Sequence, residues 1–185
     1  RELDVEVQLL DMVAERPEAE VIGDKMRIGM RSDELEDRIR AFEPDMVGVS
    51  QMFSYLEPVC EEIFRIAKSV DPNIITVWGG THPTTLPRET LSCPNADYIV
   101  LGEGEAPLKE LVERLNAGQS IKGMKSIGYC DENGEMVICD ERSWIEDLDN
   151  HVLPARHKVD MDQYLGAAKA ATMVTSRGCP FACTF

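Results

Sequence analysis

The chain has 185 residues, of which 43% are hydrophobic and 29% charged, and its formal net charge is −15. This length and composition are typical of a globular domain with its own core, which excludes a disordered chain. The strong negative charge excludes a nucleic-acid binder, because such proteins carry a basic patch for the phosphates. The sequence has no apolar run near the roughly 18–20 residues of a membrane span, and residues 1–4 do not resemble the start of a signal peptide.

The cysteines are spread along the chain, at Cys60, Cys93, Cys130, Cys139, Cys179 and Cys183. A chain of this length with several helical segments does not need a disulfide framework. We therefore expect reduced thiols and a cytoplasmic protein. The first four cysteines are interpreted as buried or half-buried structural thiols, whereas the closely spaced last two call for a separate explanation.

The N-terminal third begins with a predicted strand at residues 5–10, followed by a long irregular connection over residues 13–31. Ser32 is a candidate N-cap of a helix with acids in its first turn, and Pro44 ends that helix. Strands and helices then alternate, with strands predicted at 46–50, 74–78 and 98–101 and helices at 56–70 and 106–116.

This alternation predicts an α/β fold, a Rossmann-like (flavodoxin-like) parallel sheet with helices on both faces and right-handed crossovers. In such sheets, ligands bind beyond the carboxyl ends of the strands. Three short segments are expected there: Ser50-Gln51-Met52, Gly79-Gly80-Thr81 and Gly102-Glu103-Gly104.

The pattern changes after residue 118. Two short apolar runs, at residues 126–130 and 136–139, flank an Asn133-Gly134 pair and predict a β-hairpin. Residues 145–170 are acidic and irregular and are interpreted as a linker before a last strand at residues 171–175. The acids at 141–149 lack the ligand spacing of a calcium loop and are interpreted as a solvated face.

The most specific motif follows that last predicted strand and reads Ser176-Arg177-Gly178-Cys179-Pro180-Phe181-Ala182-Cys183-Thr184-Phe185. Taken alone, the two cysteines could be separate thiols or half of some other metal site. In this context the segment resembles the opening of the radical S-adenosylmethionine (radical SAM) cluster loop, Cys-x3-Cys-x2-Cys. The resemblance implies that Cys179 and Cys183 are two of the three thiolate ligands of a four-iron four-sulfur cluster, and that Phe185 packs near the adenine of S-adenosylmethionine. The third ligand would be residue 186, so we expect no stable cluster and no catalysis from this chain alone.

The upstream region resembles the cobalamin-binding domain that is fused to many radical SAM enzymes. The segments that carry this resemblance are residues 47–52, 78–84 and 97–105, with residues 147–156 in the linker. Anaerobic magnesium-protoporphyrin monomethyl ester oxidative cyclases and various methyltransferases belong to this group. The resemblance implies four parts: a cobalamin-binding domain at 1–118, a hairpin extension at 119–144, a linker at 145–170 and the start of the radical SAM domain at 171–185.

The same resemblance implies roles for the residues at the predicted strand ends. Ser50 and Met52 match the Ser-x-Leu element beside the tail of cobalamin, with Met in place of Leu. Paired glycines let the tail approach the backbone, since a Cβ would clash there. The implied cobalamin contacts are Ser50, Met52, Gly79, Gly80, Thr81, His82, Gly102, Glu103 and Gly104. Taken singly, each glycine is better explained by an ordinary turn after a strand.

The axial ligand of cobalt is not expected to come from this chain. The Asp-x-His-x-x-Gly motif, which supplies such a histidine in many cobalamin proteins, is absent from the sequence. His82 follows the glycine pair and is interpreted as a surface or capping residue, or as a contact with the corrin or its tail, but not as a ligand. His151 and His157 lie in the linker and are expected to be solvated.

Two functions remain open at this stage. In the first, the chain binds cobalamin for a radical SAM enzyme, whose barrel is the partner and acts on a small molecule by methyl transfer or oxidative cyclisation. In the second, it is a flavodoxin-like binding or docking module that has lost cobalamin. A dinucleotide-binding domain is disfavoured, because no Gly-x-Gly-x-x-Gly follows a strand and opens a helix, and a phosphate-binding Walker loop is absent as well.

Overall fold

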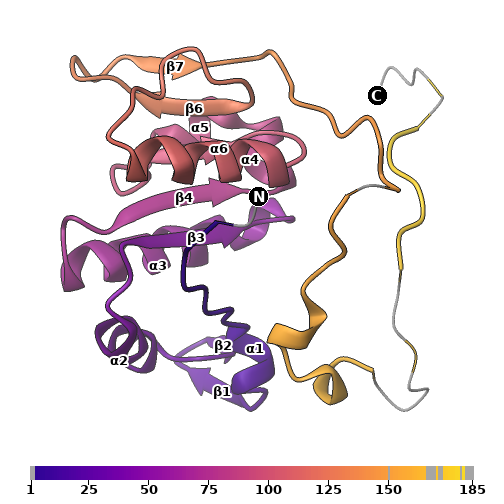
Figure 1. Ribbon diagram of the computed structural model, residues 1–185. Coiled ribbons are helices and arrows are strands. Elements are labelled where there is room, and N and C mark those ends of the chain that lie inside the picture. The colour runs from indigo at the N-terminus through magenta and orange to yellow at the C-terminus, as the bar shows by residue number, and fades with distance from the viewer. Residues whose placement is uncertain (1–2, 150, 166–169, 171–172, 180, 182–185) are drawn as a thin grey trace. The chain divides into compact units, whose positions relative to one another are not determined.

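The computed structural model (Figure 1) describes residues 3–149, 151–165, 170, 173–179 and 181. Two compact units emerge from the contacts within the chain. The first contains residues 30–144, and the second combines residues 5–29 with the part of the chain that follows residue 144.

The first unit is built on a five-stranded sheet with the strand order β3-β4-β5-β6-β7. Its three parallel strands are β3 (Met46–Ser50), β4 (Ile75–Gly79) and β5 (Tyr98–Val100). The predicted hairpin is confirmed as β6 (Ile127–Cys130) and β7 (Met136–Ile138), but it adds two antiparallel strands to the same sheet. The sheet is therefore mixed rather than wholly parallel.

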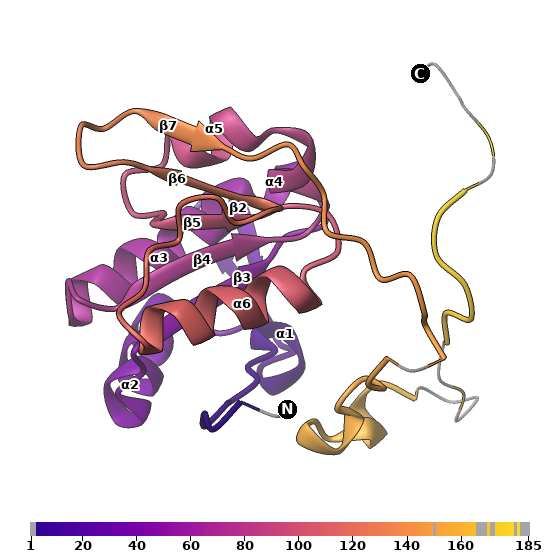
Figure 2. The ribbon, with the colours of Figure 1, turned by 45° about the horizontal axis from the view of Figure 1, so that its top comes forward.

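Helices cover both faces of this sheet, as predicted (Figure 2). On one face, α3 (Glu57–Val70) and α5 (Pro87–Leu91) pack against Trp78 and Ile99. On the other face, α6 (Glu105–Asn116) packs against Val77 and Val100. The faces alternate because successive residues of a strand point to opposite sides.

Trp78 lies at the centre of the first of these two cores. Its ring is fully buried and meets Phe64 of α3 edge-on, with the ring centroids 5.2 Å apart and the planes at 84°. Aromatic pairs favour this edge-to-face geometry. This contact packs the middle of α3 against β4.

The helix α2 (Ser32–Phe42) is present as predicted, but its cap is not. Ser32 is the first helical residue rather than the N-cap, which is Arg31. The backbone N–H of Arg31 donates to the carboxylate of Glu34 at 2.8 Å, so an acid in the first turn satisfies this N–H group. The C-cap is Glu43, in the left-handed conformation, directly before Pro44.

The prediction of a strand at residues 5–10 is wrong. These residues carry no strand, and Val5, Val7 and Leu9 are 42–50% exposed. Their alternating pattern fits a strand, but a strand also needs a hydrogen-bonded neighbour, and none of the described strands pairs with this segment.

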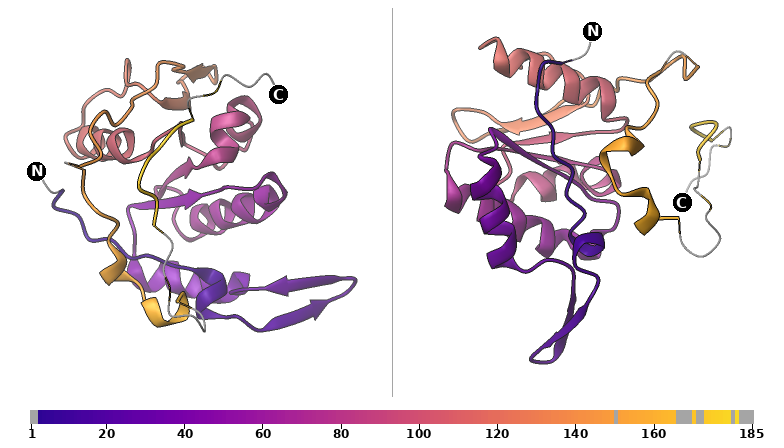
Figure 3. Two further views of the ribbon diagram at one scale, coloured as in Figure 1. Left: turned by 90° about the vertical axis from the view of Figure 1, so that its right-hand side faces the viewer. Right: turned by 60° about the horizontal axis from the view of Figure 1, so that its bottom comes forward.

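The connection at residues 13–31 contains regular structure that was not predicted. Most of the short helix α1 (Met12–Glu15) lies at its start. The antiparallel strands β1 (Ala19–Ile22) and β2 (Lys25–Ile28) follow, side by side in Figure 3. Gly23 and Asp24 form the two-residue turn between them, with Gly23 at φ 66°. A glycine in such a two-residue loop is a hairpin signal.

The C-terminal part has little regular structure among its described residues. Its described elements are two short 3₁₀ turns, η2 (Arg156–Lys158) and η3 (Met161–Gln163). The last predicted strand is not seen, since residues 173–175 have no strand conformation and Ala171 and Thr172 lie outside the described residues. None of the described helices is long and apolar enough to span a membrane.

Candidate functional site

The carboxyl ends of β3 and β4 lie side by side, as the sequence predicted. Ser50 is paired in register with Gly79, so these two small residues form adjacent last positions of the two strands. After Ser50, the side chain of Gln51 points into the protein and that of Met52 points to the solvent, since Gln51 is 1% exposed and Met52 is 65% exposed. This edge of the sheet therefore presents Ser50 and Met52 outward, with Gln51 beneath them.

The two loops that leave these strand ends are joined through their backbones. The N–H of Gln51 donates to the carbonyl of Gly79 at 2.8 Å, and the N–H of His82 donates to the carbonyl of Gln51 at 3.2 Å. A Cβ on Gly80 would lie 2.3 Å from that Gln51 carbonyl oxygen, and Gly80 has a φ of 104°. Only glycine fits at position 80, and the reason is the neighbouring loop of the protein itself.

Gly79 is in a different environment from Gly80. A Cβ on Gly79 would meet nothing nearer than the carbonyl oxygen of Val49, at 4.0 Å. The space above this strand end is therefore open, and the absence of a side chain leaves room for a group approaching from outside. This open position next to Ser50 fits the requirement for a flat nucleotide tail that lies against the backbone.

His82 is the predicted site residue whose position differs most from expectation. It is the second residue of the short helix α4 (Thr81–Thr85) and is buried, not on the surface. Its Nδ1 lies 3.0 Å from the hydroxyl of Ser54, and its ring is tilted against Trp78 with centroids 6.3 Å apart. Its Nε2 lies 3.4 Å from a carboxylate oxygen of Glu57, but the angle does not suit a hydrogen bond and no described group gives Nε2 one.

The third predicted segment lies at the end of β5 and borders α4. The backbone N–H of Gly102 donates a hydrogen bond to the hydroxyl of Thr84 at 2.9 Å. Gly102 has a φ of 74°, a conformation that favours glycine. This agrees with the interpretation of this glycine as part of an ordinary turn after a strand. Thr81 and Gly102 are exposed, whereas Glu103 and Gly104 are half-buried at the start of α6.

Two exposed aromatic residues beside Met52 were not predicted as site residues. Phe53 is 53% exposed and Tyr55 is 76% exposed, and their rings stack with centroids 5.7 Å apart and planes at 20°. Large apolar side chains in a loop at a strand end are a signal that could have identified them.

The cysteine predictions have mixed outcomes. Cys60 and Cys93 are buried and Cys139 is half-buried, as expected, but Cys130 is exposed. Cys179 is exposed and free, while Cys183 and Phe185 lie outside the described residues. Within the part of the chain that the structure describes, no group of three metal-ligating side chains is present.

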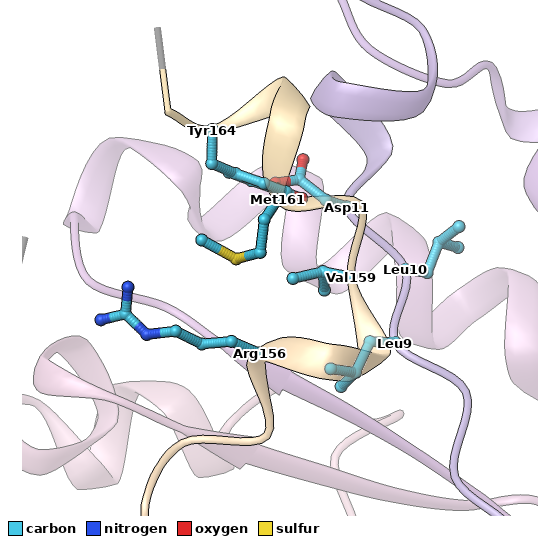
Figure 4. A pocket seen from close by; sticks show the side chains of 7 residues that line it. All are labelled: Leu9, Leu10, Asp11, Arg156, Val159, Met161 and Tyr164. Carbon is cyan, nitrogen blue, oxygen red and sulfur yellow. The ribbon is translucent and has the colours of Figure 1, made fainter. Parts of the chain in front are cut away.

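The second unit contains a cavity of about 400 Å³ (Figure 4). Its lining comes from the segment before α1 and from the linker: Leu9, Leu10, Asp11, Arg156, Val159, Met161 and Tyr164. The hydroxyl of Tyr164 donates to the carboxylate of Asp11 at 3.0 Å. The N–H of Ala14 lowers the pKa of this carboxyl, which also caps α1. These contacts tie the linker to the segment before α1.

Comparison with solved structures identifies the fold. The structure of the cobalamin-dependent radical SAM enzyme OxsB, with aqua-cobalamin and S-adenosylmethionine bound, matches 62% of this chain and 16% of that chain with a TM-score of 0.53 and 22% identity. The radical SAM methyltransferase TsrM from Kitasatospora setae matches 58% of this chain and 21% of its own with a TM-score of 0.51 and 21% identity.

Curated relatives are more similar in sequence. An uncharacterised methyltransferase of Pyrococcus horikoshii is 34% identical over 96% of this chain and 38% of its own length. The anaerobic magnesium-protoporphyrin IX monomethyl ester cyclase of Rubrivivax gelatinosus is 31% identical over 88% of this chain and 30% of its own length. The chain therefore spans less than half the length of these relatives.

The family comparison covers most of the first unit and the segment before it. The B12 binding domain family matches residues 1–112, a range that contains all three strand-end segments. Cobalamin is the cofactor of this family, and the open strand end at Gly79 beside Ser50 fits its tail. The chain belongs to the B12 binding domain family, and the solved structures that share its fold include cobalamin-dependent and other radical SAM enzymes.

Proposed function

We propose that this chain binds cobalamin on behalf of a longer radical SAM enzyme that carries out methyl transfer or oxidative cyclisation on a small molecule. The observation that carries the proposal is the open strand end at Gly79, next to Ser50, within the region matched by the B12 binding domain. The relatives support the choice of reaction, since they include a methyltransferase and a cyclase.

The residues of this chain would hold the cofactor rather than react with it. Ser50 and Met52 would contact one side of the tail and Gly79 would let it approach the backbone, while Gly102 and Glu103 form the rim at the end of β5. When bound, cobalamin supplies methyl-transfer or electron-transfer chemistry, and the protein supplies orientation and exclusion of water. No histidine of the described strand ends is positioned as a cobalt ligand, because the ring of His82 is buried beneath the loop.

The remaining assignments concern the longer protein. Cys179 and Cys183 would be two ligands of its four-iron four-sulfur cluster, and Phe185 would lie near the adenine of S-adenosylmethionine. The partner of this chain would be the radical SAM barrel that follows it, with 1–118 as cofactor domain, 119–144 as hairpin extension, 145–170 as linker and 171–185 as the start of the barrel. We place the whole enzyme in the cytoplasm, where reduced thiols such as Cys60 and Cys93 persist.

A hydroxocobalamin titration tests the proposal. The chain, and a version extended at its N-terminus, would be mixed with hydroxocobalamin, passed through gel filtration and examined by absorbance. We expect about one cobalamin to remain per chain, with the base-off spectrum of a cofactor that has no histidine ligand. If both proteins are folded and neither retains cobalamin, the alternative of a docking module that has lost the cofactor is favoured instead.

A further inference from the structure

The loop between β3 and α3 exposes most of its large side chains. Met52, Phe53 and Tyr55 are each more than half exposed, and they stand at the strand ends next to Ser50 and Gly79. Its C-terminal half is the 3₁₀ turn η1 (Ser54–Leu56), in which Leu56 packs against the core. The residues before Leu56 gain little from apolar packing, so their conformation depends largely on polar anchors.

The first anchor is Gln51, the buried residue of this loop. Its side-chain Nε2 donates to the carbonyl of Phe53 at 2.9 Å, which folds the loop back on itself. Its backbone carbonyl accepts from the N–H of His82, and its Oε1 is buried without a hydrogen-bond partner among the described residues. Gln51 therefore ties the start of the loop to the turn after β4.

The second anchor is the side chain of His82, which reaches the middle and the end of the same loop. Its Nδ1 lies 3.0 Å from the hydroxyl of Ser54, and its Nε2 lies 3.4 Å from the carboxylate of Glu57, the first residue of α3. The side chain is 1% exposed and rests against Trp78. One buried ring thus meets three parts of its surroundings: the loop, the first turn of α3 and the core beneath β4.

We infer that His82 is a positioning residue of the cobalamin site: from beneath, its ring holds the loop that presents Met52, Phe53 and Tyr55, and it does not itself touch the cofactor. The inference rests on the proposed function and changes the role that the family resemblance implied for His82, which was direct contact with cobalamin. Its basis is the Ser54 contact, the neighbouring Glu57 carboxylate and the near-complete burial of the ring.

Limited proteolysis of the cofactor-free chain tests the anchor. Chymotrypsin cuts after aromatic residues, and Phe53 and Tyr55 lie on the loop. His82→Phe keeps the ring volume against Trp78 but removes both nitrogens, so we expect cleavage at these two sites to become about ten times faster, as for the loss of one hydrogen bond. His82→Asn keeps a polar group near the place of Nδ1 and should restore cleavage to within about threefold of the original rate.

The second readout is the dissociation constant for hydroxocobalamin. We expect His82→Phe to weaken binding about tenfold and His82→Asn to recover most of that loss. Ser54→Ala removes the other partner of the same contact and should resemble His82→Phe in both assays, and it serves as the second variant if His82→Phe does not fold. His157→Phe, at an exposed linker histidine, is the matched control and should change neither readout.

The outcomes separate this inference from the proposed function. If the unsubstituted chain binds no cobalamin, the proposed function and the role in the site both fail, while proteolysis still shows whether His82 anchors the loop. If His82→Phe binds cobalamin as tightly as the original chain and is cut no faster, the positioning role is overturned. Weaker binding with unchanged loop cleavage would also overturn it, since it would mean that the ring contacts the cofactor directly.

Discussion

At the scale of single residues, the two adjacent glycines at the end of β4 have different roles. Gly80 is required by the backbone of Gln51, which lies where its Cβ would be. Gly79 has open space above it, and nothing in the described protein requires its lack of a side chain. The sequence motif alone could not separate these roles, because both residues follow the same strand. Gly79 is therefore the better position at which to test cofactor binding by substitution.

We predict that Gly79→Leu removes cobalamin binding while leaving the fold intact. Its Cβ would make only an ordinary contact with the Val49 carbonyl, so the free energy of unfolding should change by less than about 1 kcal/mol. The larger side chain would fill the space above the strand end, and we expect affinity for hydroxocobalamin to fall more than tenfold. Urea denaturation and the absorbance titration measure the two effects.

Gly80→Ala is the comparison for this variant. It places a Cβ 2.3 Å from the Gln51 oxygen at a φ of 104°, so it should destabilise the protein by about 2–3 kcal/mol through backbone strain. Binding of cobalamin by Gly79→Leu with the original affinity would show that the tail does not cross this strand end.

The cysteines differ in reactivity because they differ in burial. Burial raises the pKa of the Cys60 thiol to about 11, with the carboxylate of Glu57 adding to the effect, and burial also raises the pKa of Cys93. A thiol with a raised pKa stays protonated, and therefore unreactive, until the pH approaches that value.

We therefore predict that iodoacetamide at pH 8 modifies the exposed Cys130 and Cys179 within minutes, while Cys60 and Cys93 react only after unfolding. Peptide mass spectrometry of labelled protein measures this order, with protein labelled in urea as the fully reactive control. Rapid labelling of Cys60 in the folded protein would contradict the burial of α3 against the sheet.

At the scale of elements, the hairpin β1–β2 carries an unusual surface. In its register Ala19 pairs with Ile28 and Val21 with Met26, so these four apolar side chains share one face. Three of them are large and more than half exposed: Val21, Met26 and Ile28. Two strands alone bury little, and an exposed apolar face of this kind attracts other apolar groups.

We predict that replacing Val21 and Met26 together by serine lowers the fluorescence of the dye ANS bound to the chain by about half, since ANS reports exposed apolar surface. Ile22→Ser, on the opposite face of the same hairpin, is the control and should have a smaller effect. Equal fluorescence from the double variant and the original chain would locate the dye-binding surface elsewhere.

Long elements with a clear period were predictable from the sequence, and short ones were not. The apolar stripes of α2, α3 and α6 and the runs of β3, β4 and β5 each signal their structure locally. Helices α4 and α5 have five residues each, too few to show a helical period, and prolines lie within or next to them. The segment at 5–10 was mispredicted because strand formation depends on a neighbour that local sequence does not reveal.

For the candidate site, the sequence predicted which strand ends come together but not how the side chains around them are packed. Strand ends place Ser50, Gly79 and Gly102 together by topology, and topology follows from the order of the elements. The burial of His82 depends on α3, Trp78 and the loop at Ser54, which come from distant parts of the sequence. No local pattern distinguishes such a histidine from an exposed one.

At the scale of the whole molecule, the proposed function divides cobalamin binding and cluster binding between two regions of the chain. The strand-end site lies within residues 50–104, inside the region matched by the B12 binding domain, whereas Cys179 lies outside that region. The curated relatives are more than twice as long as this chain. Cofactor binding and cluster binding should therefore be separable by substitution.

In the longer radical SAM enzyme that we propose, we predict that Cys179→Ala abolishes the broad absorbance near 400 nm of a four-iron four-sulfur cluster, because three thiolates are needed to hold it. The same variant should retain about one cobalamin per chain. Gly79→Leu should give the reverse result, with the cluster retained and cobalamin lost. Iron and cobalt analysis of both purified variants measures the two contents independently. Loss of cobalt from Cys179→Ala would mean that cobalamin is held jointly by the two parts, and the strand ends alone would then be insufficient to bind it.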